Sequence, residues 1–142
     1  MINNLITSIS KMDQLRQAGL TYLMKREIRR GDAVMFDIDD TLLRVTGSPI
    51  SPMIKLLWDA QAAGYIVVII TARPRFEQVI QWTMNQLANN GITYDKLGFT
   101  SAETKILMKQ NLGYNFILSV GDQNTDLTGS LHWLNTSNFS HN

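Results

Sequence analysis

Runs of apolar residues recur along this chain, with amphipathic stretches between them. Ala33 to Ile38 and Tyr65 to Ile70 are mostly apolar, and the second is rich in β-branched residues, as expected of strands covered on both faces of a parallel sheet. Tyr114 to Val120 has the same character, and Leu131 to Leu134 fits a last short strand. The segment Tyr94 to Phe99 fits a further short extended stretch.

Helical periodicity fills the intervals between these strands. The first helix is predicted over about Lys11 to Arg30, with Ser10 as its N-cap and Gly31 closing its end. A second helix is predicted from Ser51 to Gly64, with a proline in its first turn, where the missing N–H is tolerated.

Two further helices are predicted in the second half of the chain. One begins at Pro74 and ends at Asn90-Gly91, and the other begins at a capping box of Thr100 with Glu103 and ends at Gly113. The apolar stripe of the first of these comprises Phe76, Val79, Ile80, Met84 and Leu87. The alternation predicts an α/β fold, a doubly wound, Rossmann-like parallel sheet flanked by helices. We expect one domain over residues 1–142, with residues 1–31 as an N-terminal helical extension.

Composition narrows the class of protein. The chain has 142 residues, of which 44% are hydrophobic and 18% charged, so it can bury a core. Its formal net charge of +1 gives no bulk argument for a nucleic-acid or membrane partner, and the lack of cysteine excludes a disulfide framework. We see neither a secretion signal nor a membrane-spanning run, so a cytoplasmic protein is expected. Lys25, Arg26, Arg29 and Arg30 form either an anion-binding patch or, as we favour, a solvated face suited to a helix C-terminus.

Polar residues collect where the predicted strands end. Because ligands of such sheets bind beyond the carboxyl ends of the strands, these residues are candidates for one site. The candidates are Asp37, Asp39, Thr71, Ala72, Arg73, Lys105, Asp122 and Asp126. Carboxylates gathered at one edge repel one another, and Mg²⁺, a hard cation that prefers oxygen ligands, relieves that repulsion. The sequence therefore predicts a Mg²⁺ site.

The spacing of Asp37 and Asp39 suits phosphoryl transfer. In an extended chain both side chains leave the same face, where one carboxylate attacks phosphorus and the other moves protons. The Thr71 hydroxyl and nearby backbone N–H groups would hold phosphoryl oxygens, and Lys105 would neutralise charge. Arg73 and Arg44 are candidate substrate contacts, with an exposed arginine as the alternative for each.

These segments resemble the four motifs of the haloacid dehalogenase (HAD) superfamily of phosphatases. Phe36 to Leu43 (FDIDDTLL) is similar to the first motif, Thr71 to the second, Lys105 to the third and Gly121 to Leu127 (GDQNTDL) to the fourth. The last motif, with a second lysine one helical turn after Lys105, looks most like the capless branch that contains class B-type acid phosphatases.

The resemblance implies specific roles. Asp37 would be the nucleophile, Asp39 the general acid/base, and Thr71, Ala72 and Lys105 neighbours of the phosphoryl group. The metal would be held by the Asp37 and Asp122 carboxylates and the Asp39 backbone carbonyl, with Asp126 as a supporting acid. The implied activity is a Mg²⁺-dependent phosphatase with an aspartyl-phosphate intermediate.

Several alternatives stay open. Lys109, one helical turn after Lys105, is a rival for the lysine of the site. A phospho-receiver module needs an aspartate ending a strand between Asp40 and Thr71, where the one acid, Asp59, lies in a predicted helix. A catalytically silent storage or binding protein of the same fold is the other alternative. His132 and His141 are expected to be structural or solvated, and Trp58, Trp82 and Trp133 are expected to pack in the core or on the surface and not to form a platform for base stacking.

The lengths of the stretches between the motifs indicate whether a cap domain covers the site. The stretches from Asp37 to Thr71 and from Thr71 to Lys105 are filled by predicted elements, so neither holds a cap domain. An open site suits a phosphorylated substrate that is itself large, or a homo-oligomer in which a neighbouring subunit covers the site. A flap around Arg44 to Ile50 that covers a small substrate is a third arrangement.

Overall fold

A computed structural model describes residues 2–137, and the surroundings of side chains from residue 11 onward. The strands are β1 (Asp32–Phe36), β2 (Ile66–Thr71), β3 (Lys96–Phe99), β4 (Asn115–Gly121) and β5 (His132–Asn135). The helices are α1 (Ile2–Met24), α2 (Ser51–Ala63), α3 (Glu77–Asn89), α4 (Lys105–Leu112) and α5 (Asn124–Leu127), with a single 3₁₀ turn, η1 (Ala102–Thr104), before α4.

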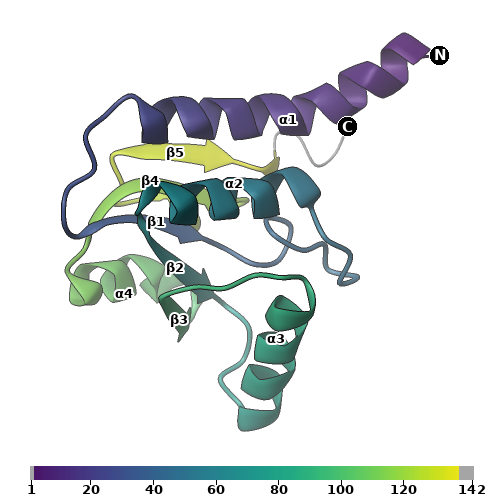
Figure 1. Cartoon of the computed structure of the whole chain (residues 1–142). Helices are drawn as coiled ribbons and strands as arrows, with labels where there is room; N and C mark the ends of the chain where they lie inside the picture. Colours follow the sequence, from purple (N-terminus) through teal and green to yellow (C-terminus); the bar gives the residue numbers. More distant parts are fainter. Residues whose placement is uncertain (1, 138–142) are drawn as a thin grey trace.

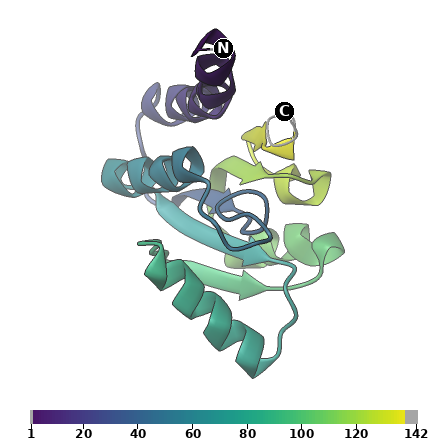
Figure 2. The same ribbon diagram turned by 90° about the vertical axis from the view of Figure 1, so that its right-hand side faces the viewer.

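The five strands form one parallel sheet in the order β3-β2-β1-β4-β5, which confirms the predicted architecture (Figure 1). Helices α1 and α2 cover one face, and α4 covers the other (Figures 1 and 2). The larger core lies under α1 and α2 and includes Leu23, Phe36 and Leu57, while a smaller cluster around Met35 and Phe116 lies on the α4 face. No inserted domain interrupts residues 2–137, so this small fold carries no cap.

The first helix differs from its prediction at both ends. It begins before Ser10, which is therefore no N-cap, and it ends at Met24 instead of Arg30. The chain leaves the helix because Asp32, at the start of β1, binds the segment that follows: its carboxylate accepts hydrogen bonds from the Arg29 backbone N–H at 2.8 Å and the Arg26 side chain at 3.1 Å. A tertiary contact thus replaces the last helical turn.

The third helix is also shorter and less buried than expected. It begins at Glu77, three residues after Pro74, and buries only Thr83 and Leu87 among its own residues. Phe76 of the predicted apolar stripe is 70% exposed and Met84 is 41% exposed. In Figure 2, α3 runs along the β3 edge of the sheet and diverges from it, which explains why much of the stripe has no core to enter.

The remaining boundaries are close to prediction, with one local exception. Helix α2 ends at Ala63 and α4 ends at Leu112, and each is followed by the expected glycine, Gly64 or Gly113, which has a left-handed backbone. The capping box predicted from Thr100 and Glu103 is not formed, and a capping box instead joins Gln123 and Asp126 at α5. None of the helices within residues 2–137 combines the length and apolarity that a membrane crossing requires.

Candidate active site

Asp37 follows β1 directly and lies at the carboxyl edge of the sheet. Its backbone N–H donates to the Val120 carbonyl of β4 at 3.0 Å, so it continues the strand pairing, and the residue is only 7% exposed. The next residue, Ile38, accepts backbone hydrogen bonds from Thr41, Leu42 and Leu43 through its carbonyl group. This turn bends the chain sharply after Asp37, at the edge of the sheet.

Asp40 has a left-handed backbone, with φ of 59°, which is unusual for a residue other than glycine. Two hydrogen bonds hold this conformation: the Asp40 N–H donates to the Leu43 carbonyl at 2.7 Å, and the Thr136 hydroxyl donates to the Asp40 carbonyl at 2.8 Å. Thr136 follows β5, and its own N–H donates to the Gly121 carbonyl at 2.9 Å. The last strand therefore fixes the loop of the first motif, a role that no sequence signal indicated.

Lys105 connects the first and fourth motifs. Its Nζ lies 2.9 Å from Oδ1 of Asp37 and 2.6 Å from Oδ1 of Asp126. The lysine is 3% exposed and Asp126 is 1% exposed, so both ion pairs are shielded from water. The other Asp126 oxygen accepts the Gln123 backbone N–H at 3.1 Å, which fixes the carboxylate from the opposite side.

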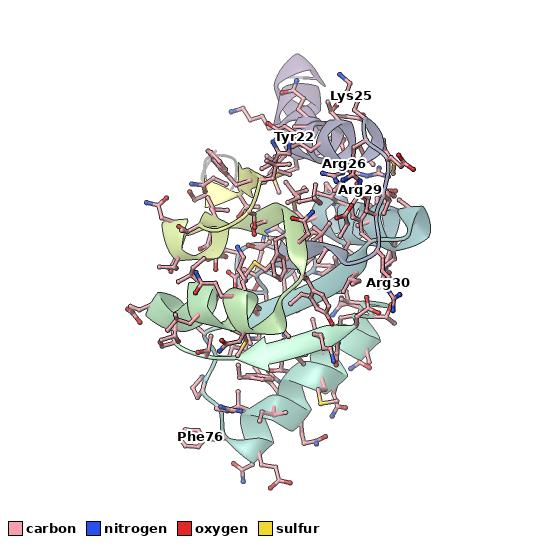
Figure 3. All side chains as sticks on the ribbon, turned by 90° about the vertical axis from the view of Figure 1, so that its left-hand side faces the viewer. Tyr22, Lys25, Arg26, Arg29, Arg30 and Phe76 are labelled. Atoms are coloured by element: carbon pink, nitrogen blue, oxygen red, sulfur yellow. The ribbon has the colours of Figure 1, made fainter. Side chains whose placement is uncertain are left out.

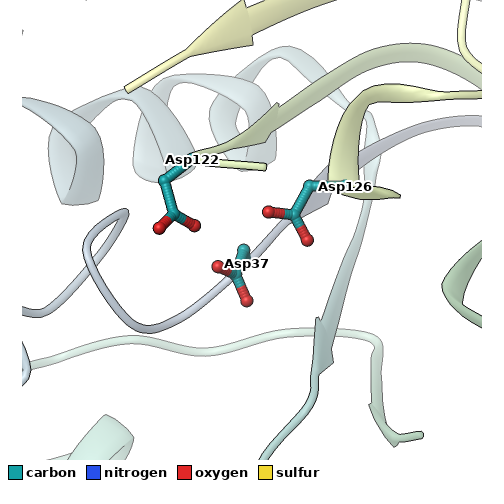
Figure 4. Close-up of side chains that lie close together, drawn as sticks. All are labelled: Asp37, Asp122 and Asp126. Carbon is teal, nitrogen blue, oxygen red and sulfur yellow. The ribbon is translucent and has the colours of Figure 1, made fainter. Parts of the chain in front are cut away.

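The side chains of Asp37, Asp122 and Asp126 converge at this edge (Figure 4). One carboxylate oxygen from each lies within 4.8 Å of the others. Asp122 comes directly after β4 and Asp126 comes from α5, so two neighbouring strands and one short helix build the cluster. Lys105 pairs with two of the three carboxylates, and the remaining negative charge, with an all-oxygen donor set, fits a hard divalent cation.

The protonation equilibria of the cluster reflect its burial. Burial raises the pKa of Asp37 well above the usual carboxyl value, Lys105 opposes this shift, and the charge of Asp126 adds to it. Burial also raises the pKa of Asp122, although to a smaller extent. For Lys105, burial alone would lower the pKa, but the charges of Asp37 and Asp126 outweigh it and raise the pKa. The lysine is therefore cationic at neutral pH.

Gly121, the last residue of β4, makes room for this cluster. A Cβ atom added there would overlap the Cβ and carboxylate of Asp126. Asp126 cannot move away easily, because Lys105 and the Gln123 N–H hold its two oxygens. A glycine is thus required by close approach at this point of the fourth motif.

Asp39 points to a different partner. Its two carboxylate oxygens accept hydrogen bonds from Arg73 Nη2 at 2.8 Å and Nε at 3.1 Å. The remaining guanidinium nitrogen, Nη1, donates to the Thr83 hydroxyl at 3.1 Å and to Oε1 of Gln86 at 2.8 Å, both on α3. The guanidinium carbon also lies 4.9 Å from the centre of the Trp82 ring. Sequence reasoning missed Gln86 and Trp82, since the spacing of residues on α3 does not show which side chain they meet.

The other predicted site residues lie around the same edge. Thr71 ends β2 and is 1% exposed, and its hydroxyl accepts the Arg73 backbone N–H at 3.1 Å. Ala72 is exposed beside it. Arg44 lies on the exposed flap after the first motif, and its Nη1 donates to the Pro49 carbonyl at 3.2 Å, so the described contacts do not include it in the carboxylate cluster.

Lys105 and not Lys109 reaches the carboxylate of Asp37. Lys109 is equally buried, but its Nζ donates to the Ser119 hydroxyl and the Thr128 carbonyl, each at 2.7 Å. Burial lowers the pKa of Lys109 to about 8. The geometry therefore resolves the choice that the sequence left open for the lysine that contacts Asp37.

His132, expected to be structural or solvated, packs against another ring. His132 stacks on Tyr22, with ring centres 4.1 Å apart, whereas His141 lies outside the described residues. The tryptophans Trp58, Trp82 and Trp133 are each more than 40% exposed. The basic segment from Lys25 to Arg30 lies between α1 and β1, remote from Phe76 beside α3 (Figure 3). It is therefore at the amino end of β1, opposite the candidate site.

Comparisons with known proteins are informative only at the level of structure. No protein-family model matches the chain, and no curated protein sequence matches it. The class C acid phosphatase from Bacillus anthracis has a similar structure, with a TM-score of 0.64, 16% identity, and coverage of 89% of this chain and 71% of that one. A chain of the Pnkp1/Rnl/Hen1 complex is similar with a TM-score of 0.57 and 21% identity, over 70% of this chain and 42% of that one.

At 16% and 21% sequence identity, the structural similarity establishes the fold alone. The chain has a HAD-like α/β fold without a cap, which it shares with the class C acid phosphatase, and it carries a buried aspartate cluster consistent with a metal site. The chain spans less than half of the matched chain from the Pnkp1/Rnl/Hen1 complex. The finer resemblance to class B-type acid phosphatases stays a prediction.

Proposed function

We propose that this protein is a Mg²⁺-dependent phosphatase that hydrolyses phosphomonoesters through an aspartyl-phosphate on Asp37. The observation that carries the proposal is the position of Asp37, which is buried at the carboxyl edge of a parallel sheet, in contact with Lys105 and beside Asp122 and Asp126. Ligands of such sheets bind at that edge.

In the first step, an Asp37 oxygen attacks phosphorus and the bond from phosphorus to the leaving oxygen breaks, while Asp39, protonated on an oxygen that Arg73 has released, gives the leaving oxygen its proton. In the second step, water attacks the phosphorus of the aspartyl-phosphate and loses a proton to Asp39. The bond between phosphorus and Asp37 then breaks, so inorganic phosphate leaves and both aspartates return to their starting state.

Other residues of the site would stabilise charge. Lys105 remains paired with the nucleophile and neutralises charge that develops on the phosphoryl oxygens, while Thr71 and the backbone around Ala72 offer hydrogen-bond donors. Arg44 and the guanidinium nitrogen of Arg73 that one Asp39 oxygen frees are the proposed contacts to more distant parts of the substrate, while a second Arg73 nitrogen stays on the other Asp39 oxygen. Mg²⁺ held by Asp37, Asp122 and the Asp39 carbonyl, with Asp126 in support, would supply electrostatic stabilisation and favour the ionised form of Asp37.

The absence of a cap bears on the substrate. An open site does not exclude water by itself, so we propose that a macromolecular phosphate covers it or that a second copy of the chain does. A monomer that is efficient only with small phosphates would contradict this part of the proposal. Measurement of mass in solution, together with a screen of phosphorylated metabolites and phosphate-ended oligonucleotides, distinguishes the cases.

The decisive experiment replaces the nucleophile. Asp37→Asn should abolish hydrolysis of an aryl phosphate in the presence of Mg²⁺ without loss of folded structure, and beryllium fluoride should occupy Asp37 in the wild-type protein. Turnover at the wild-type rate in Asp37→Asn would refute the assignment. If the folded wild-type protein hydrolyses no phosphate ester, a catalytically inactive binding protein of the same fold becomes the better explanation.

A further inference from the structure

Lys109 is a buried lysine that the proposed chemistry does not use. It is 2% exposed and forms no salt bridge within the described residues. Its ammonium group has three hydrogens and three acceptors: the Ser119 hydroxyl and the Thr128 carbonyl at 2.7 Å each, and the Asp126 carbonyl at a longer 3.4 Å. Its position is therefore specified by the protein and not by solvent.

Two of those three acceptors belong to the segment that carries the metal-site carboxylates. Helix α5 begins at Asn124 and ends at Leu127, and the carbonyls near a helix C-terminus lack partners within the helix. A lysine that donates to such carbonyls satisfies them. Lys109 thus holds the C-terminal end of α5, while Asp122 precedes its N-terminal end.

The two lysines of α4 hold the same residue at different points. Lys105 and Lys109 are four positions apart and so lie on one face of the helix. Lys105 binds the carboxylate of Asp126, and Lys109 reaches its backbone carbonyl. The segment also lies close against α4, since a Cβ atom added at Gly129 would overlap the side chain of Ile106.

We propose that Lys109 is a positioning residue for the acidic cluster: it fixes α5 so that Asp122 and Asp126 reach Asp37. It touches neither the substrate nor the reacting atoms. The inference rests on the proposed function only for the statement that the cluster binds a divalent cation.

The physical reason lies in the cost of unpaired buried groups. A methionine at position 109 would fill a similar space, but it would leave the Thr128 carbonyl and the Ser119 hydroxyl without this donor. The segment could then recover hydrogen bonds by moving toward solvent, and this shift would strain the contacts that Lys105 and the Gln123 N–H make with the Asp126 carboxylate. Loss of an outer contact that orients metal ligands commonly lowers metal affinity by about 10- to 100-fold.

The test compares three variants of the full chain. Binding of Mn²⁺, a spectroscopic probe for the Mg²⁺ site, is measured by electron paramagnetic resonance with Lys109→Met, Lys109→Arg and Leu23→Ala. Lys109→Met should weaken Mn²⁺ binding about 10- to 100-fold, and Lys109→Arg, which keeps a cation with N–H donors, should bind more tightly than Lys109→Met. Leu23→Ala removes buried core contacts of α1 and controls for general destabilisation, so its Mn²⁺ affinity should equal that of the wild type.

Hydrogen exchange provides a readout that requires no metal. In Lys109→Met the amides from Gln123 to Thr128 should exchange faster than in the wild type, while those of β1 should not change. If Lys109→Met does not fold, Lys109→Gln, which retains an N–H donor without the charge, takes its place and should show the same changes to a smaller extent.

The outcomes separate this inference from the proposed function. Wild-type Mn²⁺ affinity and unchanged exchange in Lys109→Met would overturn the inference, whatever the activity of the protein. Equal losses of Mn²⁺ affinity in Lys109→Met and Leu23→Ala would also overturn it, because they would show that Lys109 contributes only to the general stability of the fold. Weaker Mn²⁺ binding in Lys109→Met alone, in a protein that hydrolyses no phosphate ester, would support the inference and refute the phosphatase.

Discussion

Arg73 holds the carboxylate of Asp39 through two parallel hydrogen bonds, from Nη2 at 2.8 Å and from Nε at 3.1 Å. This bidentate arrangement fixes the orientation of the carboxylate as well as its position. The guanidinium is held in turn by Thr83 and Gln86, so α3 supports the side chain that we propose for proton transfer. A helix at the edge of the sheet thereby affects the site without contributing a residue to the carboxylate cluster.

Replacing the arginine should misplace Asp39. We expect Arg73→Met to lower kcat/KM by about 10²-fold, the scale of losing a general acid/base. The loss of kcat/KM should be greater for an alkyl phosphate, whose leaving oxygen needs a proton, than for an aryl phosphate. Asp39→Asn should show the same difference between the two substrates. Steady-state kinetics with the two substrates measure this difference.

The neighbouring Arg75 offers a matched control. It is exposed, and none of the hydrogen bonds or ion pairs found within the described residues involves its side chain. Arg75→Met should therefore change kcat/KM by less than about twofold, as surface substitutions usually have small effects. Equal losses for aryl and alkyl phosphates in both Arg73→Met and Asp39→Asn would count against proton transfer by Asp39.

Replacing Asp122 should weaken Mg²⁺ binding without lowering the stability of the fold. We expect Asp122→Ala to weaken Mg²⁺ binding by more than the roughly 10- to 100-fold that loss of an outer contact costs. In the metal-free protein the free energy of unfolding should be unchanged or higher, because one of three mutually repelling carboxylates is removed. Calorimetric Mg²⁺ titration and urea unfolding measure the two effects. Full wild-type activity in excess chelator, or Ca²⁺ as effective as Mg²⁺, would argue against the proposed site.

Gly121→Ala should disturb Asp126 through steric overlap. The added methyl group would meet a carboxylate that Lys105 and the Gln123 N–H hold in place, so we expect a loss of about 1–3 kcal/mol in stability and a large loss of activity. Gly113→Ala is the control, because its φ of 72° strains an alanine but no atom lies within 4 Å of the added Cβ. The control should lose stability while retaining kcat. Retained metal binding and activity in Gly121→Ala would show that the cluster tolerates the displacement.

Asp32 should make stability depend on pH. Burial alone would raise its pKa, but the Arg29 N–H, the Asn115 amide and the charge of Arg26 outweigh burial and lower the pKa. A lowered pKa in the folded state stabilises the fold above the unfolded value of about 3.9, and this contribution is lost as pH falls through the folded pKa. Asp32→Asn should thus cost roughly 1–3 kcal/mol at pH 7 and less at pH 3, below the unfolded pKa, measured by urea unfolding. An equal cost at both pH values would show that the charge is irrelevant.

Local pattern predicted β1, β2 and β4 because these strands are short, mostly apolar runs that are buried in the sheet. Tyr65 to Ile70 was expected as a buried strand, and β2 spans Ile66–Thr71. Helix boundaries were predicted well where a glycine with a left-handed backbone ends the helix, as at Gly64 and Gly113. They were predicted poorly where a distant side chain decides, as where Asp32 draws the chain out of the first helix.

By itself the sequence determined the α/β architecture and placed Asp37, Thr71 and Asp122 at one edge, because the carboxyl ends of parallel strands meet there. Only the tertiary structure decided that Lys105 contacts Asp37, that Lys109 turns to the Thr128 carbonyl, and that Arg73 binds Asp39. Helical spacing allows either lysine to face the sheet, and the packing of α4 and α5 against the strand ends selects between them. Such choices depend on distances between residues far apart in the chain, which periodicity does not encode.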